Sequence, residues 1–244
     1  MSAVQFIKRV HAKGVWSPQA VLAVAAAALV FIGWTALRVD RQMRDELLLQ
    51  GRLVRQSLDL RALEALAGAG DDADKAEYKR LKHQLVDCRS ANARCRFLYL
   101  LGRRPFSGPE KTGGQIFFYA DSEHEGSQDY SPPGDVYAGL SESEARVFTT
   151  KEALVSGPIR DRWGTWVTAL LPVSDPVTGE LLAVLGMDVD ANAWRWDVVS
   201  RTAVPASVVL GLLIVLATGV MAARVRSGEV VVKPAVGAGS VGAQ

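Results

Sequence analysis

The chain has 244 residues, with 28 lysines and arginines against 26 aspartates and glutamates, so its formal net charge is only +2. Two long apolar stretches take up much of this length and leave room for one domain of ordinary size. The segment between them is mildly acidic and carries no basic patch, which argues against a nucleic-acid-binding protein.

The two apolar stretches cover residues 18–37 and 204–223, and neither contains a charged residue. Each is long enough to cross the roughly 30 Å hydrocarbon core of a bilayer as a helix. A cleaved signal peptide is the alternative for the first stretch, but that stretch is longer than a usual signal core and lacks a small-x-small cleavage site. Buried core helices would show a polar face, and neither stretch has one. Two transmembrane helices are therefore predicted.

The charges beside these stretches indicate the topology. Residues 1–17 carry three basic residues and no acid, and residues 224–244 carry three basic residues against one acid. Basic flanks face the cytoplasm. We therefore expect a membrane protein with a short cytoplasmic segment at each end and residues 38–203 on the outer side.

The outer segment begins with helical patterns. Apolar spacing predicts one long helix over residues 40–67, ended by the Gly68-Ala69-Gly70 break. This helix is either a dimer seam or packs on its own domain, since no strict heptad separates the two. A second helix is predicted over residues 71–88, with Leu81 and Leu85 facing inward.

From Arg96 the pattern changes to short apolar and aromatic runs bounded by glycine and proline, which is typical of strands. Two runs form a predicted antiparallel hairpin, a helix follows near residues 142–154, and two further strands are joined by a tight turn. The sheet core is expected within residues 96–190. This order predicts an α+β fold with helices packed on an antiparallel sheet. The predicted strands are "RFLYLLGRR", "GQIFFYADS", "TWVTALLPVSD" and "GELLAVLGMDVDA".

The only two cysteines, Cys88 and Cys95, lie in the outer segment. In an oxidising compartment a pair at this spacing closes a short disulfide loop, whereas in the cytosol the two would be free thiols. The sequence favours the disulfide. A zinc site is not expected, because His83 and His124 lack paired spacing with the cysteines.

The stretch "RDRWGTW" places Arg162, Trp163 and Trp166 before the third of these strands. Aromatic side chains with a few polar groups are what small-molecule sites are made of, and arginine clamps carboxylates. The alternative is a surface ion-pair set at a strand entrance with ordinary aromatic packing. Asp188 interrupts an apolar strand, so it must be hydrogen-bonded, paired to a residue such as Arg162, or in contact with a ligand amine or hydroxyl.

Catalytic motifs are missing from the sequence. There is no Gly-x-Ser-x-Gly elbow and no phosphate-binding glycine loop, and the histidines stand alone. The acidic run "DSEHE" lacks the spacing of a calcium loop. We expect no catalytic residue, no metal and no cofactor.

The order of elements resembles the Cache-type sensor modules, the extracytoplasmic PAS-like domains of bacterial histidine kinases, diguanylate cyclases and chemoreceptors. The runs "RFLYLLG", "GGQIFFYADS", "DYSPPGDVY" and the closing hairpin carry the resemblance. It implies a ligand enclosed between the sheet and the segments that precede the third strand. The residues at matching positions are Tyr99, Tyr119, Asp121, Tyr130, Arg162, Trp163, Trp166 and Asp188.

The resemblance implies a membrane-anchored extracytoplasmic sensor of an unidentified small molecule. Relatives continue into a cytoplasmic effector, and the roughly twenty residues after the second span hold none, so output is expected from a separate partner. A homodimer is consistent with the long helix predicted over residues 40–67, which would form the seam between the two copies. The alternative function is a membrane-anchored interaction or scaffold protein of the cell envelope.

Overall fold

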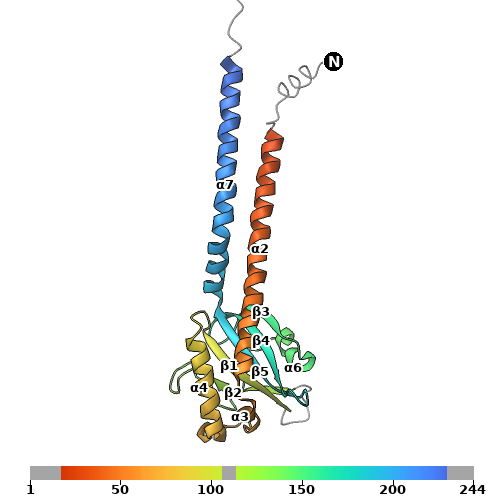
Figure 1. Ribbon diagram of the computed structural model, residues 1–244, viewed down its shortest axis with the longest axis vertical. Coiled ribbons are helices and arrows are strands. Elements are labelled where there is room, and N and C mark those ends of the chain that lie inside the picture. Colours follow the sequence, from red (N-terminus) through yellow and green to blue (C-terminus); the bar gives the residue numbers. More distant parts are fainter. Residues whose placement is uncertain (1–17, 106–113, 230–244) are drawn as a thin grey trace, which may run out of the picture. The chain divides into compact units, whose positions relative to one another are not determined.

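The computed structural model describes residues 18–105 and 114–229, with side chains described from residue 19 to residue 222 within these ranges (Figure 1). They fall into two units, residues 38–199 and the apolar segments on either side of them, and each unit is considered by itself. The predicted cytoplasmic segment 1–17 and residues 230–244 of the predicted tail lie outside the described residues.

Both apolar stretches lie in long helices, α2 (Pro18–Ser57) and α7 (Ala191–Glu229). Each helix is long and apolar enough to cross a membrane, judged by length and composition alone. Only 6% of the most apolar window of each is buried. This exposure disfavours the alternative that the stretches are buried core helices, because such helices hide their apolar side chains.

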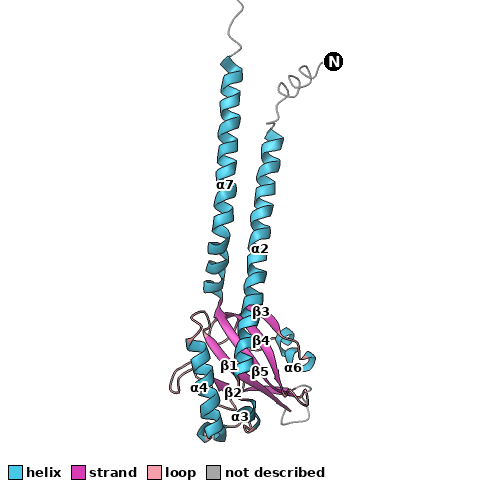
Figure 2. Ribbon diagram, viewed as in Figure 1, coloured by secondary structure: helices cyan, strands magenta, loops and turns pink. Residues whose placement is uncertain are grey.

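The unit of residues 38–199 is built on one antiparallel sheet of five strands in the order β2-β1-β5-β4-β3 (Figure 2). The predicted α+β class is therefore confirmed. Both predicted hairpins form, β1 with β2 and β4 with β5, while β3 was not singled out in the sequence. The strands are β1 (Phe97–Pro105), β2 (Gly114–Asp121), β3 (Leu154–Arg160), β4 (Thr165–Ser174) and β5 (Leu181–Asp190).

The strand pleat divides the core into two apolar layers, because successive side chains point to opposite faces of the sheet. Leu98 and Leu100 of β1 pack with the helices of the first layer, whereas Tyr99 and Leu101 belong to the second. The first layer receives α2, α3 (Leu60–Glu64) and α4 (Ala76–Ser90), and the second is covered by α5 (Glu142–Ala145) and α6 (Val147–Thr150).

The long helix expected over residues 40–67 is two helices. Helix α2 ends at Ser57, and Asp59 begins α3 by accepting a hydrogen bond from the Ala62 backbone N–H at 3.1 Å. A short 3₁₀ helix, η1 (Gly70–Asp74), then leads into α4. The predicted inward positions of α4 are confirmed, since Leu81 and Leu85 are fully buried.

The predicted disulfide is not formed, because Cys88 and Cys95 are both free and have different partners. The buried Cys95 thiol donates to the Phe97 carbonyl at 3.2 Å. The Cys88 sulfur lies 3.7 Å from the Ser57 hydroxyl oxygen, toward α2. The spacing in sequence did not reveal that α4 and the start of β1 direct the two thiols to separate neighbours.

Strand β5 continues directly into α7. Asp190 accepts hydrogen bonds from the backbone N–H groups of Asn192 and Ala193, at 2.9 and 2.8 Å, which caps the first turn of α7. Trp194 in this first turn is buried in the domain, and its indole N–H donates to Asp40 at 2.7 Å. Trp196 is exposed.

Candidate functional site

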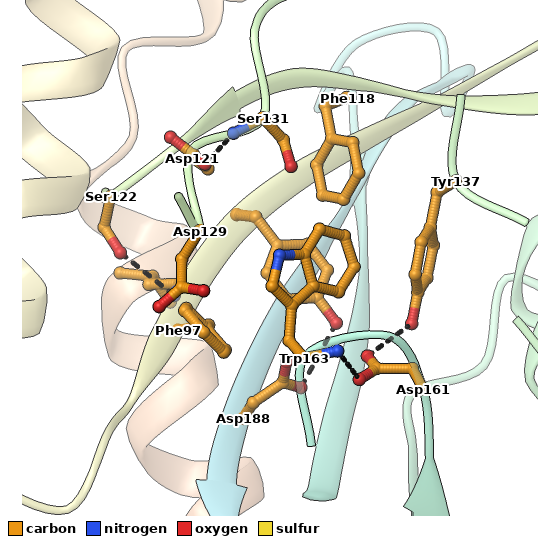
Figure 3. A pocket seen from close by; sticks show the side chains of 12 residues that line it. Phe97, Phe118, Asp121, Ser122, Asp129, Ser131, Tyr137, Asp161, Trp163 and Asp188 are labelled. Atoms are coloured by element: carbon orange, nitrogen blue, oxygen red, sulfur yellow. Dashed lines mark hydrogen bonds between the residues drawn. The ribbon is translucent and has the colours of Figure 1, made fainter. Parts of the chain in front are cut away.

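A cavity opens on the second face of the sheet, between β1, β2 and β5 and the loops at residues 129–137 and 161–163 (Figure 3). Its empty volume, which includes the open space at its mouth, is about 330 Å³. We call it the aromatic cavity. Its lining residues are Phe97, Leu98, Tyr99, Phe118, Asp121, Ser122, Asp129, Ser131, Tyr137, Asp161, Trp163 and Asp188.

Five aromatic rings form most of the cavity surface. In Figure 3 the indole of Trp163 lies among the rings of Phe97, Phe118 and Tyr137, with centroid distances of 6.4, 6.0 and 6.0 Å. Tyr99 meets Phe118 edge to face at 5.6 Å. The rings of Phe97 and Tyr99 come from β1 and that of Phe118 from β2, whereas Tyr137 and Trp163 lie in loops.

The Trp163 loop is held in place by Asp161. Its Oδ1 accepts hydrogen bonds from the backbone N–H groups of Trp163 and Gly164 and from the indole N–H of Trp166, at 2.8, 2.9 and 2.9 Å. Its Oδ2 lies 3.5 Å from the Tyr137 hydroxyl. One carboxylate therefore organises the loop that carries the cavity's tryptophan.

Asp188 is the most deeply buried carboxyl of the cavity, with 3% of its surface exposed. The Tyr99 hydroxyl donates to it at 3.2 Å, and Thr168 of the paired strand donates as well. Burial raises the pKa of Asp188 to about 7; these two hydrogen bonds oppose the rise, and the carboxylates of Asp161 and Glu144 add to it.

Asp121 lies where β2 ends. It accepts hydrogen bonds from the Ser131 backbone N–H at 2.7 Å and from Lys82 Nζ at 3.2 Å. Burial raises the pKa of Asp121 to about 6, and the contacts with Ser131 and Lys82 limit the rise. The Lys82 ammonium, 12% exposed, also lies 4.4 Å from the centre of the Tyr130 ring.

Four of the eight residues proposed from the sequence line the cavity: Tyr99, Asp121, Trp163 and Asp188. Tyr119 does not, since its neighbour Phe118 takes the cavity face and Tyr119 packs with the opposite layer. Tyr130 turns away to Tyr78, with 2.9 Å between the two hydroxyl oxygens.

Trp166 and Arg162 also lie outside the cavity lining. Trp166 is buried behind it, with its ring 5.0 Å from that of Phe97. Arg162 is exposed, stacks on Trp163 at 3.9 Å and pairs with Asp135 at 2.9 Å. Arg162 is therefore not the partner of Asp188, which takes its hydrogen bonds from Tyr99 and Thr168.

Sequence reasoning missed several lining residues, notably Asp161, Asp129 and Tyr137. Tyr137 ends the run "DYSPPGDVY", one of the runs that carry the sequence resemblance. Its backbone N–H donates to Ile116 O at 2.9 Å, and Val136 bridges Phe117, so the segment is fastened along β2. The Asp-x-x-Gly spacing of Asp161 and Gly164 was the available signal for a side-chain-capped turn.

The described residues include no group of three or more His, Cys, Asp or Glu side chains placed to hold a metal ion. The cavity offers carboxylates, hydroxyls and aromatic rings. This arrangement can enclose and orient a small molecule through hydrogen bonds and ring contacts.

No known protein family matches the chain, and no curated protein matches it. Solved structures similar to the chain include the sensory domain of the Campylobacter jejuni chemoreceptor Tlp3 with isoleucine bound, at 13% identity and a TM-score of 0.44, covering 75% of this chain and 67% of that one. The Tlp3 ligand-binding domain in complex with L-valine is similar at 12% identity and a TM-score of 0.43, covering 75% and 68%.

A third similar structure is the extracellular domain described as that of a histidine kinase, soHK1S-Z6, at 13% identity and a TM-score of 0.43, covering 72% of this chain and 65% of that one. The solved structures similar to this chain thus include a chemoreceptor sensory domain and a histidine-kinase extracellular domain.

Proposed function

We propose that the chain is a membrane-anchored sensor whose outer domain binds a small molecule in the aromatic cavity. The observation that carries this proposal is the buried carboxyl of Asp188 at the base of a ring of aromatic side chains. A buried carboxyl that meets only neutral donors costs stability when it ionises. Such a costly group inside a cavity is typical of a binding site.

The position of Asp188 suggests how binding would reach the membrane. Asp188 lies on β5, and β5 runs without a loop into α7 at Ala191. A ligand that moves the end of β5 would therefore move the first turn of α7. The domain would alternate between two arrangements whose populations the ligand shifts.

We propose the topology that the flanking charges predict, with residues 38–203 outside the bacterial inner membrane and both termini in the cytoplasm. Output would then pass to a separate cytoplasmic effector, and a homodimer would carry the signal through its paired helices. Cysteine pairs introduced into α2 and α7 test this mechanism. Cross-linking that no bound ligand alters would contradict it.

The binding proposal is tested by a melting screen of the full chain in dodecyl maltoside against a broad metabolite panel. A ligand that binds the folded state must raise the melting temperature. Asp188→Asn is expected to abolish the rise, whereas Asp175→Asn, the same change in the exposed β4–β5 turn, leaves it intact. A chain that no metabolite stabilises would contradict the sensor and favour the scaffold alternative.

A further inference from the structure

The aromatic cavity is lined by four aspartates and by no lysine, arginine or histidine. Two of the aspartates have cations beside them: Asp121 pairs with Lys82 at 3.2 Å and Asp129 with Arg96 at 2.7 Å. Asp161 and Asp188 form no ion pair within the described part of the chain, and their hydrogen bonds come from neutral groups. The cavity therefore has an excess of negative charge when Asp188 is ionised.

The rings around this charge form a cage. Phe118 lies 5.4 Å from Tyr137 and 5.6 Å from Tyr99, and Tyr99 lies 6.4 Å from Tyr137, as measured between ring centroids. Aromatic faces attract cations, and cages of several rings are the usual device for binding alkylated ammonium groups. The aromatic rings and the carboxylates therefore both favour a positively charged ligand.

The arginines nearest the cavity are already occupied. Arg96 stacks on Phe97 at 4.1 Å and pairs with Asp129 and Glu123, both at 2.7 Å. Arg162 stacks on Trp163 and pairs with Asp135. Neither lines the cavity, so the cavity offers no guanidinium to clamp a ligand carboxylate.

We propose that the ligand is a small organic ammonium ion without a carboxylate, whose nitrogen lies beside Asp188 within the rings of Tyr99, Phe118, Tyr137 and Trp163. This inference rests on the proposed sensor function and gives the chemical class of its ligand. The ammonium charge would compensate Asp188, and the rings would surround its carbon substituents.

The lining rings pack closely against one another, with 5.4 Å between the centroids of Phe118 and Tyr137 and 6.0 Å between those of Phe118 and Trp163. An ammonium ion with carbon substituents therefore enters only if the cavity widens toward its mouth. Trp163 is half-buried and sits on a loop rather than on a strand. Ligand entry would therefore displace Trp163, and tryptophan fluorescence would report binding.

The test measures binding to the full chain in dodecyl maltoside, a detergent without an ammonium group. The probes are ethanolamine and its mono-, di- and trimethylated forms, the last being choline. The neutral isostere is 3,3-dimethylbutan-1-ol, and glycine betaine adds a carboxylate to the trimethylammonium group. At least one ammonium alcohol is expected to bind tenfold or more tightly than both comparison compounds and to change the fluorescence.

Variants locate the binding. Asp188→Asn is expected to lower the affinity for the tightest-binding ammonium probe tenfold or more. Asp175→Asn, in the exposed turn, is the matched control and should leave this affinity unchanged. Trp163→Phe keeps a ring in the cage and should retain binding while removing most of the fluorescence change. Loss of affinity in both aspartate variants alike would overturn the assignment to Asp188.

The outcomes separate this inference from the sensor function. The inference is overturned if betaine or the neutral isostere binds as tightly as the ammonium alcohols, or if no ammonium alcohol binds. The sensor proposal survives either result when another metabolite binds and Asp188→Asn removes that binding. Both fail when no compound of any class binds to the cavity.

Discussion

The Tyr99 hydroxyl on β1 donates a hydrogen bond to Asp188 on the adjacent strand β5, across 3.2 Å. Burial raises the pKa of Asp188 to about 7, so this carboxyl changes its charge near neutral pH. Two consequences follow for stability, one from the ionisation of Asp188 and one from the space that holds the Tyr99 ring.

Asp188 should make the domain less stable as the pH rises. Its pKa is higher in the folded chain than its usual value of 3.8, so the folded state binds the proton more tightly than the unfolded state. The contribution of Asp188 to stability is therefore complete below about pH 4 and is lost as the pH rises to about 7. The total loss is at most about 4 kcal/mol, at about 1.4 kcal/mol for each unit of pKa.

Asp188→Asn removes this ionisation. The difference in melting temperature between Asp188→Asn and the natural chain is expected to shift in favour of the variant between pH 5 and pH 8. Asp175→Asn, in the exposed turn, should show no such trend. A difference that stays constant across this range would contradict a buried, titrating Asp188.

Gly186 leaves the space that the Tyr99 ring fills. A Cβ at Gly186 would lie closer to the Tyr99 ring atoms Cε2 and Cζ than van der Waals contact allows, so Gly186→Ala must push the ring aside. We expect a loss of about 1–3 kcal/mol of unfolding free energy, measured by thermal melting. Gly70→Ala is the control, because the added methyl group meets no atom within 4 Å. Equal melting temperatures for the two variants would show that the Tyr99 ring is not tightly held.

Much of the sheet was predictable from the sequence. Both predicted hairpins form, and alternation along β4 puts Trp166 in one apolar layer and Val167 in the other. Apolar alternation is strong where one face of each strand is buried.

The rest depended on contacts between distant residues. The register of β1 and β2 shifts between Leu100 and Leu101, so the sequence did not show whether Phe118 or Tyr119 would face the cavity. Asp59 divides the first helix through a local cap that apolar spacing does not reveal. Asp129 and Tyr137 reach the cavity from loops, which have no periodic pattern to read.

Asp161 is expected to be the main stabiliser of the Trp163 loop. Asp161→Ala leaves two backbone N–H groups and the Trp166 indole without their acceptor. We expect a loss of about 1–3 kcal/mol in unfolding free energy. Tryptophan fluorescence should also change, because the tryptophan side chain of the loop becomes more exposed to solvent. Arg162→Ala removes an exposed ion pair with Asp135 and a stacking contact with Trp163, and should cost about 1 kcal/mol or less. Equal losses in the two variants would contradict this role of Asp161.

Trp194 joins the first turn of α7 to α2 within the domain of residues 38–199. Its indole N–H donates to Asp40 Oδ1 at 2.7 Å, and Asp40 Oδ2 accepts from Arg44 Nε at 2.8 Å. Trp194→Phe removes a hydrogen bond to a charged acceptor and leaves unfilled space in the core. A loss of about 2 kcal/mol is expected, or a fall of roughly 4–8 °C in melting temperature for a domain of this size.

Trp196→Phe is the matched control, because Trp196 is 72% exposed whereas Trp194 is 4% exposed. Its melting temperature should change little, since substitutions at exposed positions alter stability by about 0.5 kcal/mol or less. Circular dichroism of the full chain in dodecyl maltoside measures both variants without relying on tryptophan emission. If Trp196→Phe proved as destabilising as Trp194→Phe, the hydrogen bond to Asp40 would not be what fastens α7 to the domain.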